Sequence, residues 1–358
     1  MGSKTTGRGQ RGSDRSAARR GVLALAGVVA VVLVIGAAWF VFAGARPPSN
    51  PGSPGESASA TAMATRDPLE PLTIASVQKY PHLVFQNVIR DDAYAHVALI
   101  PLDAPGGMRV DTDLECERVS FAGGTGICLA AEHGADTRYY ASLFGMDFRP
   151  YQRINLDGPP TYASVSIDGR LAAATVLLEP KSEENEQPPS RTIIVNTETG
   201  QPVADLDSFS VVRDGVPVSH EALDLWGVTF KSDGDGFFAS LRLGADIYLV
   251  EGSLLDAKLI VRQQAVSAPS LSPDGTRIAY DRLVSSDGPT WRFHVLDLAT
   301  GMDAELAERQ SVDDQMAWLD TDRVLYGLTS DTWSLNSDGT GEPQPFLFDG
   351  LSASVVRH

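Results

Sequence analysis

The fold is decided by the stretch Ser272-Pro273-Asp274-Gly275-Thr276-Arg277-Ile278-Ala279-Tyr280. It places an Asp-Gly turn directly before a short apolar run, and a second short run, Ala268-Pro269-Ser270-Leu271, comes directly before the turn. An Asp-Gly pair between two such runs indicates a β-hairpin, because glycine adopts positive φ freely and aspartate bonds its own backbone. The stretch therefore predicts two antiparallel strands joined by a tight turn.

The same layout recurs upstream, at Val165-Ser166-Ile167-Asp168-Gly169 and again at Phe230-Lys231-Ser232-Asp233-Gly234. Recurrence at a period of ~40–50 residues, with four strands in each unit, is typical of a β-propeller. Five complete units are expected at 115–155, 162–206, 226–261, 268–306 and 315–348. The interval between Asp168 and Asp233 is too long for one repeat, which indicates an insertion near 209–225, and a polar stretch at 179–190 indicates a second.

Strands are left over at both ends of this series. His82–Val88, Ala95–Leu102 and Met108–Val110 supply three strands without an innermost partner, and Ala353–Val356 supplies one strand without a blade. We expect the last strand to complete the first blade, because closing the ring removes its open sheet edges. The sequence thus predicts an all-β fold, a six-bladed β-propeller closed by a C-terminal strand.

The repeat resembles that of TolB-like, WD40-related six-bladed propellers. The resemblance rests on the stretch at 272–280 and on two further phrases, Phe293-His294-Val295-Leu296-Asp297-Leu298-Ala299-Thr300-Gly301 and Ile193-Ile194-Val195-Asn196-Thr197-Glu198-Thr199-Gly200. It covers residues ~80–358 and implies the fold rather than a partner. TolB itself carries an α/β domain before its propeller, where this chain has a polar tether, so a TolB role is not carried over. The Arg-, Ala- and Gly-rich, Lys-poor composition suits an actinobacterial type.

The N-terminal region has the pattern of a membrane anchor. Residues 1–20 are basic, and the stretch 21–45 contains no charged residue. A helix of ~20 apolar residues spans a bilayer, and the positive-inside rule keeps the basic end in the cytoplasm. The expected organisation is a disordered basic cytoplasmic tail (1–20), a transmembrane helix (21–45), a disordered Pro/Ser/Ala-rich extracytoplasmic linker (46–79) and the propeller (80–358). A cleaved signal peptide is the alternative, although its apolar core is ordinarily ~7–15 residues long.

Charge narrows the range of partners. The formal net charge is −17, and because residues 1–20 are basic, the rest of the chain is more acidic still. Such acidity argues against nucleic acid and anionic lipid as partners and favours a solvated surface or basic partners. From the N-terminal pattern we expect a single-pass protein of the cell membrane, with its C-terminal domain extracytoplasmic.

The two cysteines, Cys116 and Cys128, are predicted to form a disulfide. In an extracytoplasmic domain, an even number of cysteines is interpreted first as a disulfide framework, and two buried free thiols are the alternative. The Gly-rich turn at 122–126 lies between them, so we expect them on the first two strands of one blade, the second.

The sequence shows no catalytic, cofactor-binding or metal-binding constellation. The Asp-Gly pairs have a sufficient structural role in turns. Asp233-Gly234-Asp235-Gly236 lacks the ligand run of a calcium loop, and the six histidines are scattered. Trp226, Trp291, Trp318 and Trp333 are interpreted as blade packing. Two functions remain: a non-catalytic module that binds a protein or cell-envelope component, or a hydrolase or lyase acting on a cell-wall or extracellular glycan at the channel mouth. Carboxylates converging at one mouth would favour the enzyme.

Overall fold

The computed structural model describes residues 71–179, 188–219, 223–285 and 290–357. In these ranges two short helical turns, α1 (Ile74–Val77) and η1 (Leu206–Ser208), accompany an otherwise all-β structure. No helix in them is long and apolar enough to span a bilayer. The predicted transmembrane helix (21–45), the basic tail (1–20) and the linker up to residue 70 lie outside the described residues.

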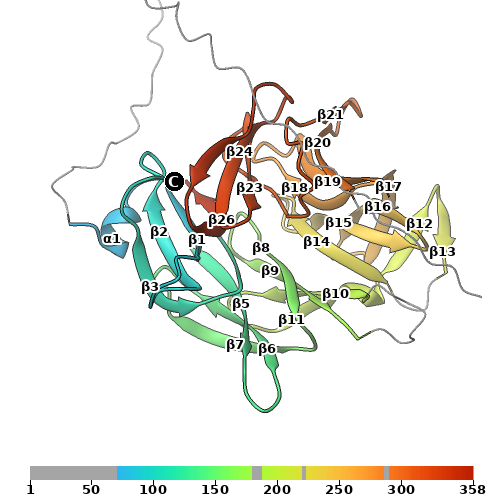
Figure 1. Ribbon diagram of the computed structural model, residues 1–358. Coiled ribbons are helices and arrows are strands. Elements are labelled where there is room, and N and C mark those ends of the chain that lie inside the picture. Colours follow the sequence, from blue (N-terminus) through green and yellow to red (C-terminus); the bar gives the residue numbers. More distant parts are fainter. Residues whose placement is uncertain (1–70, 180–187, 220–222, 286–289, 358) are drawn as a thin grey trace, which may run out of the picture. The chain divides into compact units, whose positions relative to one another are not determined.

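The described strands form six sheets, which are the blades of a β-propeller (Figure 1). Each innermost strand contacts the innermost strand of the next blade around the ring. Blade one consists of β1 (His82–Asn87), β2 (His96–Pro101), β3 (Val110–Glu115) and β26 (Gly350–Val356), and blade two of β4 (Arg118–Ala122), β5 (Thr125–Glu132), β6 (Arg138–Phe144) and β7 (Pro150–Leu156). Blade three consists of β8 (Pro160–Val165), β9 (Leu171–Leu177), β10 (Ser190–Asn196) and β11 (Pro202–Asp205), and blade four of β14 (Asp224–Phe230), β15 (Gly236–Leu243), β16 (Asp246–Ser253) and β17 (Lys258–Gln264), with β12 (Ser210–Arg213) and β13 (Val216–Val218). Blade five consists of β18 (Ser267–Leu271), β19 (Arg277–Ser285), β20 (Thr290–Asp297) and β21 (Asp303–Glu305), and blade six of β22 (Ala317–Trp318), β23 (Arg323–Leu328), β24 (Asp331–Asn336) and β25 (Gln344–Leu347).

Blade one is closed by the C-terminal strand, as the leftover strands predict. β26 pairs antiparallel with β1, with Val84 opposite Ser354 and His82 opposite Val356 (Figure 1). Because β26 is the innermost strand of a blade whose other strands come first in the chain, the two ends of the domain are joined in one sheet. The predicted six blades and their closure are confirmed.

The Asp-Gly turns are held by their own side chains. In blade five the Ser272 hydroxyl donates to Asp274 Oδ1 (2.5 Å), and the Thr276 amide donates to the same atom (3.1 Å). Gly275 follows at φ +71°, a conformation that glycine adopts without strain. These hydrogen bonds lower the pKa of Asp274. The structural interpretation of the repeated Asp-Gly pairs is confirmed, since Ser166 and Asp168 repeat the arrangement in blade three.

The hydrophobic core lies between neighbouring blades. Between blades five and six, Ala279, Phe293 and Tyr326 are buried together with Trp318, and the Trp318 indole donates to the Ser270 carbonyl (2.9 Å). Trp226 likewise donates to the Ser267 hydroxyl across blades four and five (3.0 Å). For these two tryptophans the packing interpretation is confirmed.

The insertion near 209–225 enlarges blade four. The hairpin β12–β13 adds two strands to its outer edge, and β12 runs parallel to β17. Phe209 and Val211 are buried against the blade. The insertion therefore covers an edge that would otherwise be open to pairing. Most of the second expected insertion, at 179–190, lies outside the described residues.

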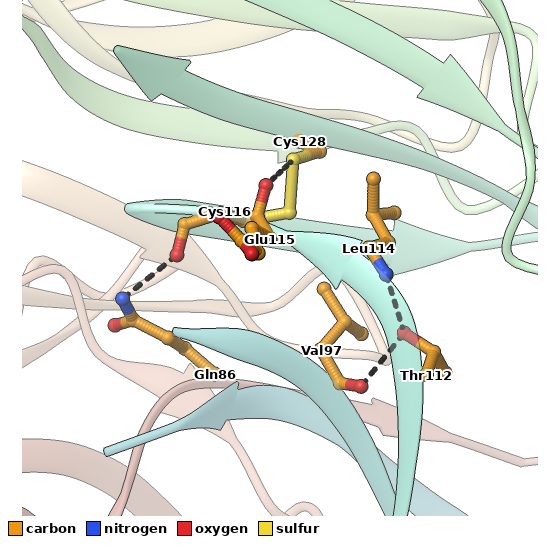
Figure 2. The surroundings of a disulfide bond; sticks show 7 residues. All are labelled: Gln86, Val97, Thr112, Leu114, Glu115, Cys116 and Cys128. Carbon is orange, nitrogen blue, oxygen red and sulfur yellow. Dashed lines mark hydrogen bonds between the residues drawn. A yellow bond between two sulfur atoms is a disulfide. The ribbon is translucent and has the colours of Figure 1, made fainter. Parts of the chain in front are cut away.

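The disulfide between Cys116 and Cys128 is present, and it joins different elements from those expected (Figure 2). Glu115 ends β3 and β4 begins only at Arg118, so Cys116 lies in the connector between blades one and two rather than on the first strand of blade two. Its amide donates to the Ala95 carbonyl (2.9 Å), and Gln86 Nε2 donates to its carbonyl (2.7 Å). The expected strand boundaries were wrong here because blade one's outer strand continues to Glu115. The bridge therefore links the connector that follows β3 of blade one to β5 of blade two.

Helix α1 lies within the stretch expected to be linker. Thr73 and Ser76 form a reciprocal capping box at its start, which stabilises even a single turn. Val77 is fully buried among the core residues of blade one, which include Val97 and Leu99. The packed structure thus begins before residue 80.

Candidate functional site

The innermost strands surround a central channel. It forms a cavity of about 460 Å³ lined by residues of all six innermost strands. Its lining runs from Arg118 and Tyr162, near the starts of β4 and β8, to Gly123 and Asp274 in the turns that follow β4 and β18. The channel therefore has two ends. The strand-start mouth is lined by Arg118, Tyr162, Asp314 and Gln315, with Asp313 next to Asp314 in the chain, and the turn mouth lies at Gly123 and Asp274.

Small hydroxyl side chains line the channel wall. They come from five of the six innermost strands, namely Ser120, Ser164, Thr229, Ser270 and Ser354. Some of them join neighbouring blades: Ser354 Oγ accepts from the Phe121 amide (3.1 Å), and Thr229 Oγ1 accepts from the Leu271 amide (3.1 Å). The Ser164 hydroxyl has no hydrogen-bond partner among the described residues. The wall thus combines hydroxyl groups with apolar side chains such as Val119, Val228 and Leu271.

Charged groups from two blades meet at the strand-start mouth. Arg118 of blade two forms an ion pair with Asp314, which precedes β22 of blade six (3.2 Å). The second oxygen of Asp314 accepts from the Gly327 amide (2.8 Å). Asp313, which directly precedes Asp314 in the chain, is exposed. Tyr162 of blade three lines the same cavity.

Asp281 lies beneath this mouth. It is fully buried on β19, opposite Ser267 of β18. Side chains alternate along a strand, so Asp281 faces the same way as Ala279, which packs between blades five and six. Neither carboxylate oxygen has a hydrogen-bond partner of ordinary geometry among the described residues.

The segment 313–315 covers the start of β18. Gln315 Nε2 donates to the Pro269 carbonyl there (3.1 Å). A β-bulge separates Ser267 from Ser270, and Ala268 has φ +48°. Such bulges redirect side chains and are common beside functional sites. The start of β8 is also bulged, between Pro160 and Tyr162.

The pKa of each of the three carboxyl groups at this mouth is raised, and burial is the largest cause for all three. Burial, and then the charges of Asp313 and Asp314, raise the pKa of Asp281 well above its ordinary value, although the nearby Asp314 backbone N–H lowers it slightly. Burial raises the pKa of Asp314 against the opposing effect of Arg118. Although Asp313 is exposed, partial desolvation and then the charge of Asp314 raise the pKa of its carboxyl group, against the opposing effect of Arg118. A carboxyl group in such surroundings retains its proton to higher pH than a free aspartate.

Tyr162 belongs to the same electrostatic group. Burial, and then the charges of Asp313, Asp281 and Asp314, raise the pKa of its phenol well above the ordinary value. The phenol therefore stays protonated at neutral pH and can donate a hydrogen bond. Together the mouth offers a guanidinium, a phenol and three carboxyl groups. The carboxyl group of Asp281 is the one that is fully buried without a hydrogen-bond partner of ordinary geometry.

Other charged clusters are internally paired. A hollow of about 430 Å³ between blades four and five contains Lys231 and Arg262, and both contact Glu251 (2.7 and 2.5 Å). His294 Nδ1 lies 3.0 Å from Asp303 Oδ1. Across the described ranges, no group of three or more His, Cys, Asp or Glu side chains has the geometry to hold a metal ion.

Of the residues singled out in the sequence, only the two cysteines are brought together, and they are structural. Asp281, Asp313, Asp314, Arg118 and Tyr162 were missed. One signal was present: Asp281 continues the run Ile278-Ala279-Tyr280 at a position that shares the core-facing side of Ala279. An acid where the alternation calls for an apolar residue marks a buried charge.

The fold and channel define a closed six-bladed propeller of the TolB-like type with a charged strand-start mouth. No protein-family model matches the sequence, and no curated protein matches it. Among solved structures, TolB from Acinetobacter baumannii is similar, with a TM-score of 0.54, 12% identity, and coverage of 78% of this chain and 67% of that chain. A structure of a nidogen/laminin complex has a TM-score of 0.51, 10% identity, and coverage of 77% and 98%. Identities this low show the fold alone.

Proposed function

We propose that this propeller is a non-catalytic binding module that captures another protein of the cell envelope at the strand-start mouth of its channel. The observation that carries the proposal is the convergence of Arg118, Tyr162 and Asp314 from three blades on one cavity. Asp313 directly precedes Asp314, and nearby Asp281 is buried with no hydrogen-bond partner of ordinary geometry for its carboxylate oxygens. Groups with unsatisfied hydrogen-bonding capacity around a cavity are typical of a ligand site.

One of the two solved structures described above is that of a protein–protein complex, of nidogen with laminin. Propellers support many functions, so this likeness is an analogy of fold. Because the other charged clusters are internally paired, the strand-start mouth is the best-supported contact region in the described part of the chain.

We further propose that the stretch 21–45 holds the propeller at the outer face of the cell membrane. The support is its charge-free composition after a basic N-terminus. Protease added to intact cells is expected to remove the propeller and leave a short membrane-bound fragment. Full protection of the propeller, or its release into the medium by signal peptidase, would contradict this orientation.

Site-specific photocrosslinking tests the binding role. A photoreactive residue replaces exposed Glu117, beside Arg118, in the full-length protein in living cells; the matched control replaces Ile167, which is 62% exposed beside the turn at Asp168. We expect a discrete protein adduct from position 117 and none from position 167. Absence of an adduct at 117, or the same adduct from both positions, would contradict capture at the strand-start mouth.

A second candidate is a hydrolase or lyase acting on a glycan at the same mouth. The convergence of Asp281, Asp313 and Asp314 favours it, because carboxyl groups meeting at one mouth are what such an enzyme needs. The raised pKa values of Asp281 and Asp313 also suit a general acid, which must hold its proton until it reacts. The test is release of soluble fragments from purified cell-wall glycan by the wild-type protein and by Asp281→Asn. Release that is lost in the variant would support the enzyme, and no release by the wild type would reject it for that substrate.

A further inference from the structure

The charges at the strand-start mouth do not balance. Three carboxyl groups, on Asp281, Asp313 and Asp314, face one cation, Arg118, and that cation is paired with Asp314. No ion pair within the described ranges involves Asp281 or Asp313. Elsewhere in the propeller, buried or half-buried acids such as Glu251 and Asp303 do have cationic partners. Among the described residues, these two acids therefore have no cationic partner in an ion pair.

Asp281 is the residue that makes this imbalance costly. Burying a carboxyl group without a hydrogen bond destabilises a protein by several kcal/mol if charged and by roughly 1–3 kcal/mol if neutral. The side chain is fully buried and directed into the space between blades five and six, beneath the segment 313–315. Because packing alone would be better served by an apolar residue, this position is better explained by a ligand than by the fold.

We propose that the strand-start mouth binds a primary ammonium group, from a free amine or from a lysine side chain of a partner, between Asp281 and Asp313. An ammonium group carries three N–H donors and one positive charge, which match two carboxylates that have no cation of their own. Tyr162 adds an aromatic ring at the same mouth, and aromatic faces attract ammonium groups. The inference rests on the proposed function, since it names the chemistry of what the mouth captures.

Binding must be coupled to proton release. In the empty site the Asp281 carboxyl group holds its proton, because the burial that raises its pKa disfavours the charged form. An arriving ammonium ion forms an ion pair with the carboxylate, and the carboxyl O–H bond breaks to release one H⁺ to the solvent. The charge balances, because one cation binds while one proton leaves. Affinity is therefore expected to rise with pH, by up to ~10-fold per pH unit while Asp281 is protonated in the free protein.

Titration calorimetry of the full-length protein tests this coupling. The probes are n-butylammonium chloride for a free amine, Nα-acetyl-lysine amide for a lysine side chain, and n-butanol as a neutral control. Each is titrated at pH 6 and pH 8, in two buffers of different ionisation enthalpy. We expect tighter ammonium binding at pH 8, up to one proton released per ligand, and no binding of butanol. Preference for the lysine amide identifies a partner side chain as the source, and preference for butylammonium identifies a free amine.

Variants locate the site. Asp281→Asn and Asp313→Asn are each expected to weaken ammonium binding at least tenfold, and Asp281→Asn also abolishes the pH dependence. The matched control is Asp214→Asn, which makes the same charge change at a side chain that is 93% exposed. Unchanged binding in both site variants, equal weakening in the control, or tighter binding at lower pH would each overturn the proposal. A photoadduct at position 117 together with no ammonium binding would reject this inference and leave the proposed function standing.

Discussion

At the scale of single residues, the molecule separates two kinds of aspartate. Those of the Asp-Gly turns, such as Asp274, accept several hydrogen bonds, which lower their pKa. Asp281 accepts none of ordinary geometry, and its pKa is raised. Aspartates of the first kind stabilise hairpins, whereas Asp281 costs stability. The same residue type therefore indicates structure in one setting and function in the other.

The first prediction concerns the pH dependence of Asp281→Asn. The folded-state pKa of Asp281 lies above the ordinary value of 3.8, so its contribution to stability is largest below 3.8 and is lost as pH rises through the folded-state pKa. Asparagine cannot ionise. We expect the variant to gain stability over the wild type as pH rises from 4 to 8, by up to ~1.4 kcal/mol per pH unit until the folded-state pKa is passed. Urea unfolding at several pH values measures the difference. A difference that is constant with pH would show that Asp281 is not desolvated.

The candidate site could not be predicted from the sequence, and the reason is physical. Arg118, Tyr162, Asp281 and Asp314 belong to four blades and are brought together only by closure of the ring. In the sequence Arg118, Tyr162 and Asp314 stand near strand starts, where polar residues are ordinary, whereas Asp281 stands in the middle of β19. The anomaly at Asp281 was visible in the alternation of its strand, but its neighbours were not.

At the scale of elements, hairpins and register follow closely from local signals. The Asp-Gly turns correctly predicted the hairpins β8–β9, β14–β15 and β18–β19, because the turn residues and the period-two alternation of the flanking runs both indicate a hairpin there. The boundary between β3 and β4 was misplaced, because a connector of two residues leaves no gap in the apolar pattern. The disulfide was predicted correctly, and its position in the connector depends on that boundary.

The second prediction concerns this disulfide. The Cys116→Ala/Cys128→Ala variant frees the connector between blades one and two. The bridge spans a sequence separation of 12 residues, for which the loop-entropy account gives ~2–3 kcal/mol. We expect a loss of this size in the free energy of unfolding, without loss of fold, since Gln86 and Ala95 still hold the connector. Chemical unfolding with and without reductant measures it; a stability identical to wild type would show that the bridge contributes nothing.

The third prediction concerns β26. Deleting residues 350–358 removes the innermost strand of blade one and exposes β1, together with part of a cluster that includes Leu83 and Phe85. We expect aggregation and the loss of a single cooperative thermal transition. Shortening the predicted tether at 46–66 is the control and should leave the melting temperature unchanged. A truncated protein that melts like the wild type would contradict closure by this strand.

At the scale of the whole molecule, a ring of blades turns dispersed residues into one site. Neighbouring blades bury their apolar faces against each other, and the channel is what the six innermost strands leave at the centre. The wall is lined with hydroxyls and the strand-start mouth with charges, so the two parts of the channel offer different chemistry. The fold follows from repetition in the sequence, whereas the site follows from the few positions where the blades differ.

The central claim is that the strand-start mouth is the contact surface, and amide hydrogen exchange tests it most directly. The full-length protein is measured with and without the protein captured through position 117. We expect slower exchange with the partner bound at 118–120, 161–164 and 313–317, and unchanged exchange in the turns at 166–170 and 272–276. Protection confined to those turns, or no protection anywhere in the channel, would contradict the account.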